Sequence, residues 1–171
     1  IYISLTIVCI FSYFYFGMSL FDAITHGFTT ISNIDISKVC VDQMIEKYRD
    51  KTGLSWQQMN TTALEFPDEA FDAVIDKGTL DSILCGEGST SNVGKALSEI
   101  TRVLKPNGVL LMLSYGIPDN RLSYLDNDAY HWSVQVHTVP KPTVSASAAQ
   151  DSSDANSVHY MYVCAKGDSE S

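Results

Sequence analysis

Residues 71–86 read FDAVIDKGTLDSILCG, and residues 97–116 read LSEITRVLKPNGVLLMLSYG. The first stretch predicts an apolar strand that ends on the charged pair Asp76 and Lys77. The second predicts an amphipathic helix, a polar turn at 105–108 and another apolar strand. This alternation of strands and helices is typical of an α/β domain with a parallel sheet, and such sheets bind ligands at the carboxyl ends of their strands.

The remaining sequence supplies further elements for the same sheet. Strands are predicted at 5–11, 30–35, 54–59, 71–76 and 109–115, helices at 19–26, 39–49 and 93–104, and an antiparallel pair at 128–139 and 158–165. Segment 140–157 is rich in Ser, Ala and Asp and lacks apolar periodicity, so we expect a flexible loop there. The chain of 171 residues suits one domain, which we assign to 1–171.

The segment 1–21 contains no charged residue. A helix of that length would be about 32 Å long, close to the hydrocarbon core of a bilayer, so a membrane anchor is one interpretation. The continuous run of Ile, Val and Phe at 5–11 also suits a parallel strand buried on both faces. No basic residue flanks the segment, which favours the buried strand.

Charge and cysteine usage narrow the function classes. The net charge is −9, with 20 acidic and 11 basic residues, which argues against nucleic acid as a partner and would favour encounters with a basic protein. The four cysteines, Cys9, Cys40, Cys85 and Cys164, are far apart and stand in apolar runs. They are therefore predicted to be free and buried, in a reducing compartment and without a metal.

Two motifs carry a resemblance to a known family. DKGTLD at 76–81 and RVLKPNG at 102–108 resemble the class I S-adenosylmethionine-dependent methyltransferases, and most closely the methyltransferase-like 13 group, which includes lysine methyltransferases of translation elongation factor 1-alpha. The resemblance extends from about 27 to 166. It implies a Rossmann-like sheet, mostly parallel with an antiparallel C-terminal strand, S-adenosylmethionine as cofactor, a protein lysine as acceptor, and a cytoplasmic location.

The cofactor-binding candidates follow two strands. Asp35 ends the strand 30–35, where Rossmann-like folds bind ribose hydroxyls, although an ordinary turn Asp would look the same. The resemblance places Ile36 beside the adenine. It also places Asn60, where the family usually has Asp, and the backbone amide of Thr61 against the adenine edge. The alternative for Asn60 is a plain loop amide.

The resemblance places Asp76 and Lys77 beside the methionine part of the cofactor and the acceptor. Asp76 is the predicted catalytic residue, because a carboxylate can orient a lysine amine, and Lys77 is predicted to position the cofactor. The alternative is a structural pair at a strand end. Asp81 is interpreted as a first-turn helix residue. Three aromatic residues are candidates for the wall of the acceptor pocket, although an aromatic residue at such spacing is more often part of the core: Tyr115, Tyr130 and Trp132.

The family's glycine-rich cofactor loop has no counterpart in the expected place. Residues 13–17 read YFYFG, whose bulky aromatics would fill volume that glycines leave open for the cofactor. Two hypotheses follow. The chain is a protein-lysine methyltransferase, or it is a non-catalytic or truncated protein of the same fold with impaired cofactor binding.

Overall fold

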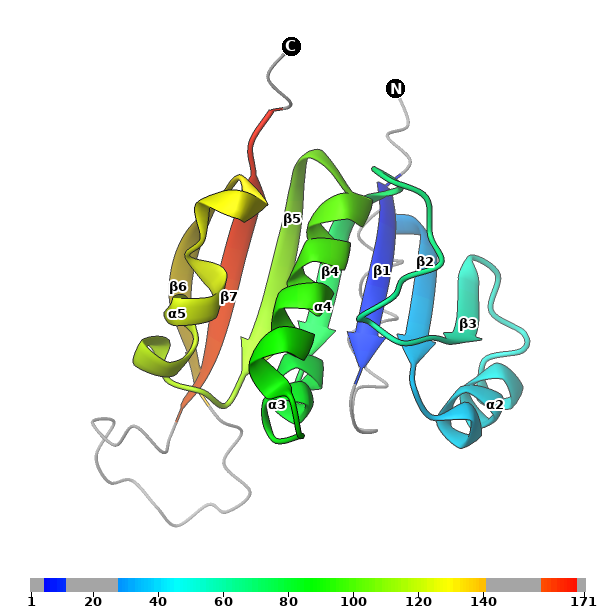
Figure 1. Ribbon diagram of the computed structural model, residues 1–171. Coiled ribbons are helices and arrows are strands. Elements are labelled where there is room, and N and C mark those ends of the chain that lie inside the picture. The colour runs from blue at the N-terminus through cyan, green and yellow to red at the C-terminus, as the bar shows by residue number, and fades with distance from the viewer. Residues whose placement is uncertain (1–4, 12–27, 141–157, 169–171) are drawn as a thin grey trace.

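The computed structural model describes residues 5–11, 28–140 and 158–168. They form a seven-stranded sheet in the order β3-β2-β1-β4-β5-β7-β6 (Figure 1). The strands are β1 Leu5–Phe11, β2 Phe28–Asp35, β3 Leu54–Gln58, β4 Phe71–Lys77, β5 Leu104–Ser114, β6 Trp132–Pro140 and β7 Val158–Lys166. Strands β1 to β5 pair in parallel, and β7 is antiparallel to both β5 and β6. The predicted α/β sheet, mostly parallel with an antiparallel C-terminal strand, is confirmed.

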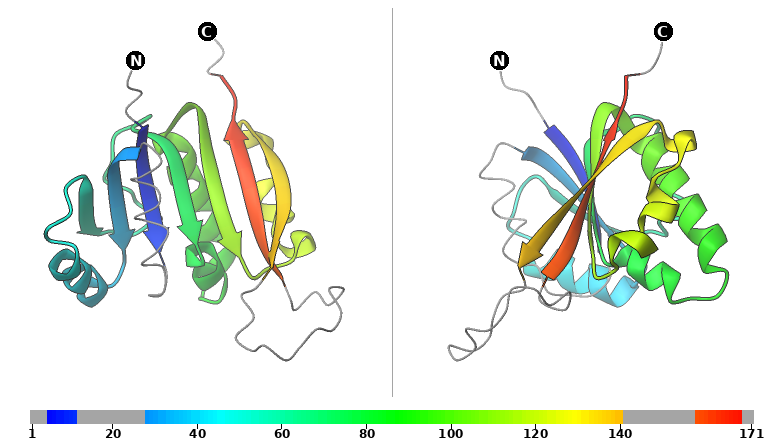
Figure 2. Two further views of the ribbon diagram at one scale, coloured as in Figure 1. Left: turned by 180° about the vertical axis from the view of Figure 1, so that it is seen from behind. Right: turned by 90° about the vertical axis from the view of Figure 1, so that its left-hand side faces the viewer.

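The helices lie mainly on one face of this sheet. They are α2 Lys38–Lys47, α3 Thr79–Leu84, α4 Ser89–Val103 and α5 Leu122–Leu125, with 3-10 turns η1 Pro118–Asn120 and η2 Asp128–Tyr130. Figure 2 shows α3, α4 and α5 together on one side of the strands, while α2 lies beyond the end of β2, near β3. Helix α2 starts after Ser37, whose hydroxyl accepts a hydrogen bond from the Cys40 amide at 3.3 Å and caps the helix.

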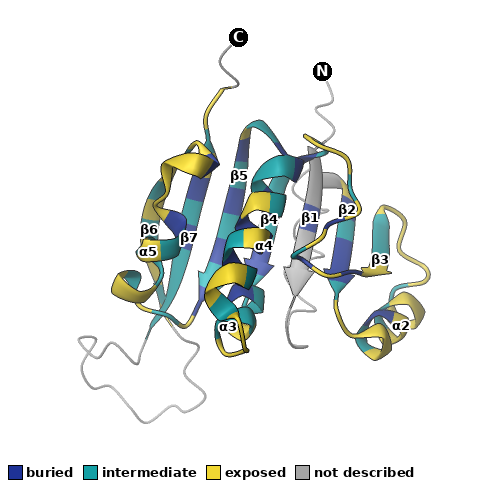
Figure 3. Cartoon of the chain, in the orientation of Figure 1, coloured by how far each residue is buried: buried dark blue, intermediate teal, exposed yellow. Residues whose placement is uncertain are grey.

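Burial alternates along the central strands and separates their two faces. Helix α4 buries Val93, Ala96, Leu97, Ile100 and Val103, the stripe that its sequence spacing predicts. These residues share a core with the alternate residues of β4, β5 and β7 (Figure 3). Because successive side chains of a strand point to opposite faces, Asp76 points toward the helices and Lys77 away from them.

Strand β1 takes the central place that the apolar run 5–11 predicts. Val8 is fully buried and pairs with Ser32 of β2 on one side and Val74 of β4 on the other. The buried strand is thus confirmed. Over the described ranges, no helix is long and apolar enough to cross a membrane.

Two local predictions were wrong. The polar turn expected at 105–108 lies inside β5, where pairing with β4 shifts register between Phe71 and Ala73 and Asn107 takes a φ of 61°. The Pro-Asn-Gly signal therefore produces an irregularity in a strand rather than a turn before it. Residues 128–130 form η2 instead of extended chain, so β6 begins only at Trp132.

The predicted burial of the cysteines holds only in part. Cys164 is buried and Cys40 half-buried, whereas Cys85 is exposed at the end of α3. The helix predicted at 19–26, the segment at 13–17, almost all of the flexible loop predicted at 140–157 and the side chain of Cys9 lie outside the described residues.

Candidate functional site

The candidate site lies at the carboxyl ends of the parallel strands. The parallel strands lie in the order β3-β2-β1-β4-β5. The chain therefore builds the sheet outward from β1 in one direction and from β4 in the other, and the switch point of the sheet lies between β1 and β4. At this edge Asp35 pairs with Gln58, and Lys77 pairs with Phe11 and Leu113. The ends of five neighbouring strands therefore bring the predicted cofactor residues to one edge.

Asp35 and Ile36 form a rigid turn after β2. The carboxylate of Asp35 accepts a hydrogen bond from the Ser37 amide at 2.7 Å, and its backbone oxygen accepts one from the Met59 amide at 3.0 Å. The Ile36 side chain is 68% exposed although it is apolar. A half-buried carboxylate beside an exposed apolar side chain suits a ribose and an adjoining flat base.

Asn60 and Thr61 open the β3–β4 loop, residues 59–70. The side-chain oxygen of Asn60 accepts hydrogen bonds from the amide and the hydroxyl of Thr62, both at 3.0 Å. The Thr61 side chain is buried. The oxygen that was predicted to accept from adenine already receives two hydrogen bonds, so an adenine amine would have to displace the Thr62 hydroxyl from it.

Glu99 and Arg102 of α4 hold the middle of the β3–β4 loop. Glu99 accepts a hydrogen bond from the Leu64 amide at 2.7 Å. Arg102 donates to the backbone oxygens of Leu64 at 2.9 Å and Phe66 at 2.8 Å, and it forms an ion pair with Asp68 at 2.7 Å. Hydrogen bonding to Arg102 lowers the pKa of Glu99. The loop that carries Asn60 is therefore fastened to a helix of the main core.

The carboxyl group of Asp76 lies beneath α3 and not on the open edge. It is 1% exposed, and one oxygen accepts a hydrogen bond from the Leu80 amide at 3.3 Å. Within the described residues the other oxygen has no hydrogen-bond partner. Burial, together with a smaller effect of the nearby Asp81 charge, raises the pKa of Asp76 to about 8. Asp76 thus holds the first turn of α3, and contact with a substrate amine requires α3 to move.

Lys77 lies on the opposite face of β4. Its backbone pairs with Leu113, and the next residue, Gly78, has a φ of 74° and donates its amide to the Leu113 oxygen at 3.2 Å. The glycine allows the left-handed turn from β4 into α3. Asp76 and Lys77, which the sequence places together at the end of a strand, therefore lie on opposite faces of the sheet.

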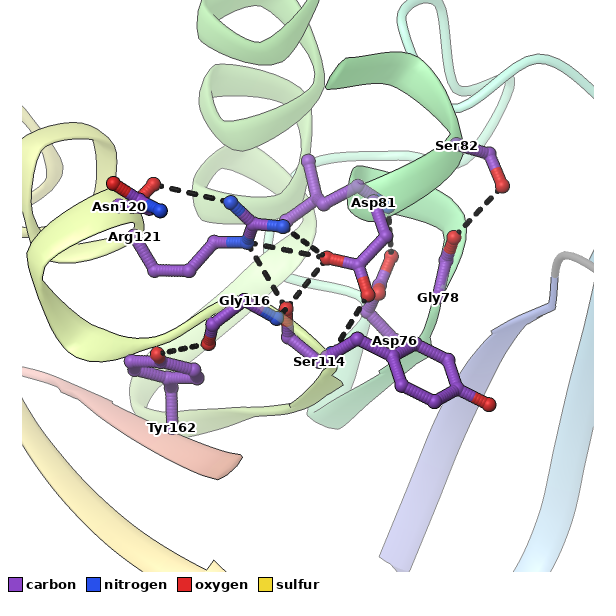
Figure 4. Close-up of polar contacts among 11 residues, drawn as sticks. Asp76, Gly78, Asp81, Ser82, Ser114, Gly116, Asn120, Arg121 and Tyr162 are labelled. Carbon is purple, nitrogen blue, oxygen red and sulfur yellow. Dashed lines mark hydrogen bonds and ion pairs between the residues drawn. The ribbon is translucent and has the colours of Figure 1, made fainter. Parts of the chain in front are cut away.

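Sequence reasoning missed the polar cluster that joins α3, β5 and the start of α5 (Figure 4). Asp81 forms an ion pair with Arg121 at 2.8 Å, accepts a hydrogen bond from the Tyr115 amide at 2.9 Å, and accepts another from the Ser114 hydroxyl. Both charged side chains are 15% exposed. No local pattern could have indicated this pair, because Arg121 follows Asp81 by 40 residues.

The structure separates the three candidate aromatics. Tyr115 follows β5 at the carboxyl edge, is 70% exposed, and meets His159 edge-to-face at 4.9 Å. Trp132 pairs with Lys166 at the opposite edge of the sheet, and the buried Tyr130 packs against it at 5.0 Å. Tyr130 and Trp132 pack with the hydrophobic core, as the alternative expected, and lie apart from Tyr115.

Metal-ligating side chains do not cluster in the part of the chain that the structure describes. Among those residues, no three His, Cys, Asp or Glu side chains are grouped so that they could hold an ion. The site therefore consists of carboxylates, amides, one lysine and one exposed aromatic ring.

Comparison with known proteins relates this geometry to a family. The sequence profile of a family described as a methyltransferase domain matches residues 17–112. EEF1A lysine methyltransferase 4 of Mus musculus is 35% identical over 120 residues, which make up 66% of this chain and 47% of that protein. The chain spans about half the length of this relative.

Two solved structures show the same fold at low identity. A SAM-dependent methyltransferase of Methanosarcina mazei superposes with a TM-score of 0.72 at 14% identity, covering 98% of this chain and 96% of that one. The N-methyltransferase NodS of Bradyrhizobium japonicum, in complex with S-adenosyl-L-homocysteine, gives 0.67 at 11% identity, covering 95% and 78%.

Proposed function

This chain belongs to the methyltransferase domain family, and we propose that it transfers a methyl group from S-adenosylmethionine to a lysine side chain of a protein. Membership confirms the resemblance found in the sequence and, with it, S-adenosylmethionine as the family's cofactor. The observation that carries the choice of acceptor is the 35% identity to a relative named for methylation of elongation factor 1-alpha. That protein is the first acceptor to test, and the cytoplasmic location stays a prediction.

We assign the cofactor-binding roles to residues at the carboxyl edge. Asp35 would accept hydrogen bonds from the ribose hydroxyls, and the exposed Ile36 would pack beside the adenine. Asn60 and the Thr61 amide would meet the adenine edge, and Lys77 would lie near the methionine part. The support is their common position at the carboxyl edge of the parallel strands, together with an apolar side chain left exposed beside a carboxylate.

For methyl transfer, the main task of the protein is to align the acceptor amine with the methyl group of the cofactor. S-adenosylmethionine, when bound, supplies an electrophilic methyl group. The lysine amine must lose its proton and lie in line, and such alignment is worth up to about 7–11 kcal/mol in favourable cases. Asp76, which the sequence predicts as the catalytic residue, would instead act as a positioning residue by holding α3 and the turn at Gly78. The net charge of −9 favours encounter with a basic protein rather than a nucleic acid.

Calorimetric titration with S-adenosylhomocysteine tests cofactor binding first. We expect the full chain to bind, and Asp35→Ala to lower the affinity by about 1–3 kcal/mol, because the substitution removes a hydrogen-bonding partner of the ribose. Asp42→Ala is the matched control, since it removes an Asp that forms an exposed ion pair with Lys38 on α2. Unchanged binding by Asp35→Ala would contradict the ribose assignment.

Methyl transfer is then measured on purified elongation factor 1-alpha by mass spectrometry of its lysines. A folded chain that binds no S-adenosylhomocysteine would favour the alternative, a non-catalytic protein of this fold. Replacing Tyr13 and Tyr15 with glycine would locate the defect, because recovered affinity would assign it to the YFYFG segment.

A further inference from the structure

We propose that Asp81 and Arg121 are positioning residues that hold the β5–α5 loop, residues 115–121, and thereby fix Tyr115 as one wall of the acceptor site. The inference rests on the proposed function and extends it to Arg121 and to Asp81, which the sequence indicated only as a first-turn helix residue. Neither charged side chain is open enough to meet a protein substrate itself, since each is only 15% exposed. They act through the loop.

The contacts converge on the point where the chain leaves β5 (Figure 4). Asp81 accepts the Tyr115 amide at 2.9 Å and two nitrogens of Arg121, at 2.8 and 3.1 Å. Arg121 also donates to the Ser114 hydroxyl oxygen at 3.0 Å and to the Asn120 backbone oxygen at 3.1 Å. One carboxylate and one guanidinium thus tie both ends of the loop to α3.

Gly116 and Tyr162 complete the anchor. A Cβ built on Gly116 would overlap the guanidinium of Arg121, so the glycine provides the space in which that group lies. The Gly116 amide donates to the Ser114 hydroxyl oxygen at 2.9 Å, and the Tyr162 hydroxyl donates to the Gly116 backbone oxygen at 2.7 Å. The backbone on both sides of Tyr115 is therefore fixed by buried groups.

The anchored loop presents an aromatic ring at the carboxyl edge. The Tyr115 ring is 70% exposed and is supported edge-to-face by His159 of β7. Tyr115 follows Leu113, the pairing partner of Lys77, by two residues. The face of a tyrosine ring attracts the ammonium group of a lysine, and the ring can also pack against the aliphatic part of the lysine side chain. The position of this ring would decide how well a substrate lysine is held.

Amide hydrogen exchange tests the anchor independently of activity. In Asp81→Asn we expect the peptide covering 114–121 to exchange at least about tenfold faster, while peptides from α4 keep their wild-type protection. Asp42→Asn is the control, because it neutralises an Asp of an exposed ion pair on α2. Gly116→Ala is the second variant, since it displaces the guanidinium while keeping both charges.

Kinetics test the link to the acceptor. With elongation factor 1-alpha as substrate, Asp81→Asn should raise KM for the protein about fivefold or more, and S-adenosylhomocysteine affinity should stay within about twofold. Tyr115→Ala should raise KM in the same way. In the Tyr115→Ala background, Asp81→Asn should add little, because residues that act through the same group are not additive.

The outcomes separate this inference from the function on which it rests. Unchanged loop exchange in both Asp81→Asn and Gly116→Ala overturns the anchor. A loosened loop with unchanged KM, or independent effects of Asp81→Asn and Tyr115→Ala, overturns the role at the acceptor site. A wild-type chain that neither binds S-adenosylhomocysteine nor methylates the factor overturns the proposed function and the acceptor role together, whereas altered loop exchange would still support the anchor.

Discussion

Two loops lie at the candidate site, and each is held by an arginine–carboxylate pair. The two pairs differ in how far their side chains are exposed to solvent. The β3–β4 loop is held by Glu99 and Arg102, whose side chains are 23% and 30% exposed and whose bonds go largely to backbone groups of the loop. The β5–α5 loop is held by Asp81 and Arg121, each 15% exposed and bonded to one another. The two loops border opposite sides of the site, the adenine side and the acceptor side of the proposed function.

The difference in exposure between the two pairs predicts how much stability each region loses when one partner of its pair is removed. Removing one partner of a buried pair leaves the other charge without compensation in a poorly solvated place. A partner at a half-exposed position can instead be solvated by water, so the loss is smaller and stays local. The acceptor side should therefore depend more strongly on its anchor than the adenine side does.

The largest effect is expected for Arg121→Ala. It leaves the part-buried Asp81 carboxylate without its cation, so we expect the free energy of unfolding to fall by about 3 kcal/mol in urea denaturation. Arg49→Ala removes an exposed pair with Glu46 and should change stability by less than about 0.5 kcal/mol. A loss for Arg121→Ala as small as that of the control would break the comparison.

Arg102→Ala should destabilise by a smaller amount, about 1–2 kcal/mol, because water can partly solvate the groups it leaves. Faster amide exchange should be confined to the β3–β4 loop and include the Leu64 amide, which donates to Glu99. Arg102→Lys keeps the charge but cannot reach all five oxygens that the guanidinium binds, two of them on Glu99, and should recover only part of the stability. Equal losses for Arg102→Ala and Arg121→Ala would show that burial does not separate the two anchors.

The pH dependence of stability should also differ between the two regions. Folding raises the pKa of Asp76, beside the buried anchor, from 3.8 to about 8, so the folded protein binds a proton that the unfolded chain releases. The free energy of unfolding should fall as pH rises between these values, by at most about 1.4 kcal/mol per pH unit, and Asp76→Asn should remove that slope. The lowered pKa of Glu99 acts oppositely, because its stabilisation is lost as pH falls through its folded pKa. Urea denaturation at several pH values would measure both pH dependences of the free energy of unfolding. A slope that Asp76→Asn leaves unchanged would contradict the raised pKa of Asp76.

The smallest effect is expected for Tyr162→Phe. The fully buried hydroxyl donates to the Gly116 oxygen, and its loss should reduce stability by about 1 kcal/mol. Because Asp81 and Arg121 remain, exchange at the Tyr115 amide should rise less than in Asp81→Asn. A greater rise in Tyr162→Phe would identify the tyrosine, and not the ion pair, as the main anchor of the β5–α5 loop.

Much of the sheet follows from local pattern. The apolar runs at 5–11, 71–76 and 109–115 predict β1, β4 and most of β5, and the spacing from Val93 to Val103 predicts the buried stripe of α4. These predictions succeed because burial of a strand or of a helix face depends on periodicity within a few residues. The turn expected at 105–108 fails for the opposite reason, since pairing with β4 draws a turn-like sequence into a strand.

The place of a candidate site residue was predictable from the sequence only where it depends on the position of that residue along a strand. Asp35, Asn60 and Lys77 follow predicted strands and therefore reach the carboxyl edge. The orientation of Asp76 toward α3 and the separation of Tyr130 from Tyr115 depend on which face and which edge each residue occupies.

The sequence by itself determined most of the elements, the mostly parallel sheet that its motifs imply, and the family. Only the tertiary structure decided which charges meet. Asp81 and Arg121 are brought together across 40 residues by the packing of α3 and α5 on one face of the sheet, and Glu99 reaches Leu64 across 35. The physical reason is that periodicity records the average environment of a residue, whereas an ion pair depends on the positions of two particular atoms in the folded chain.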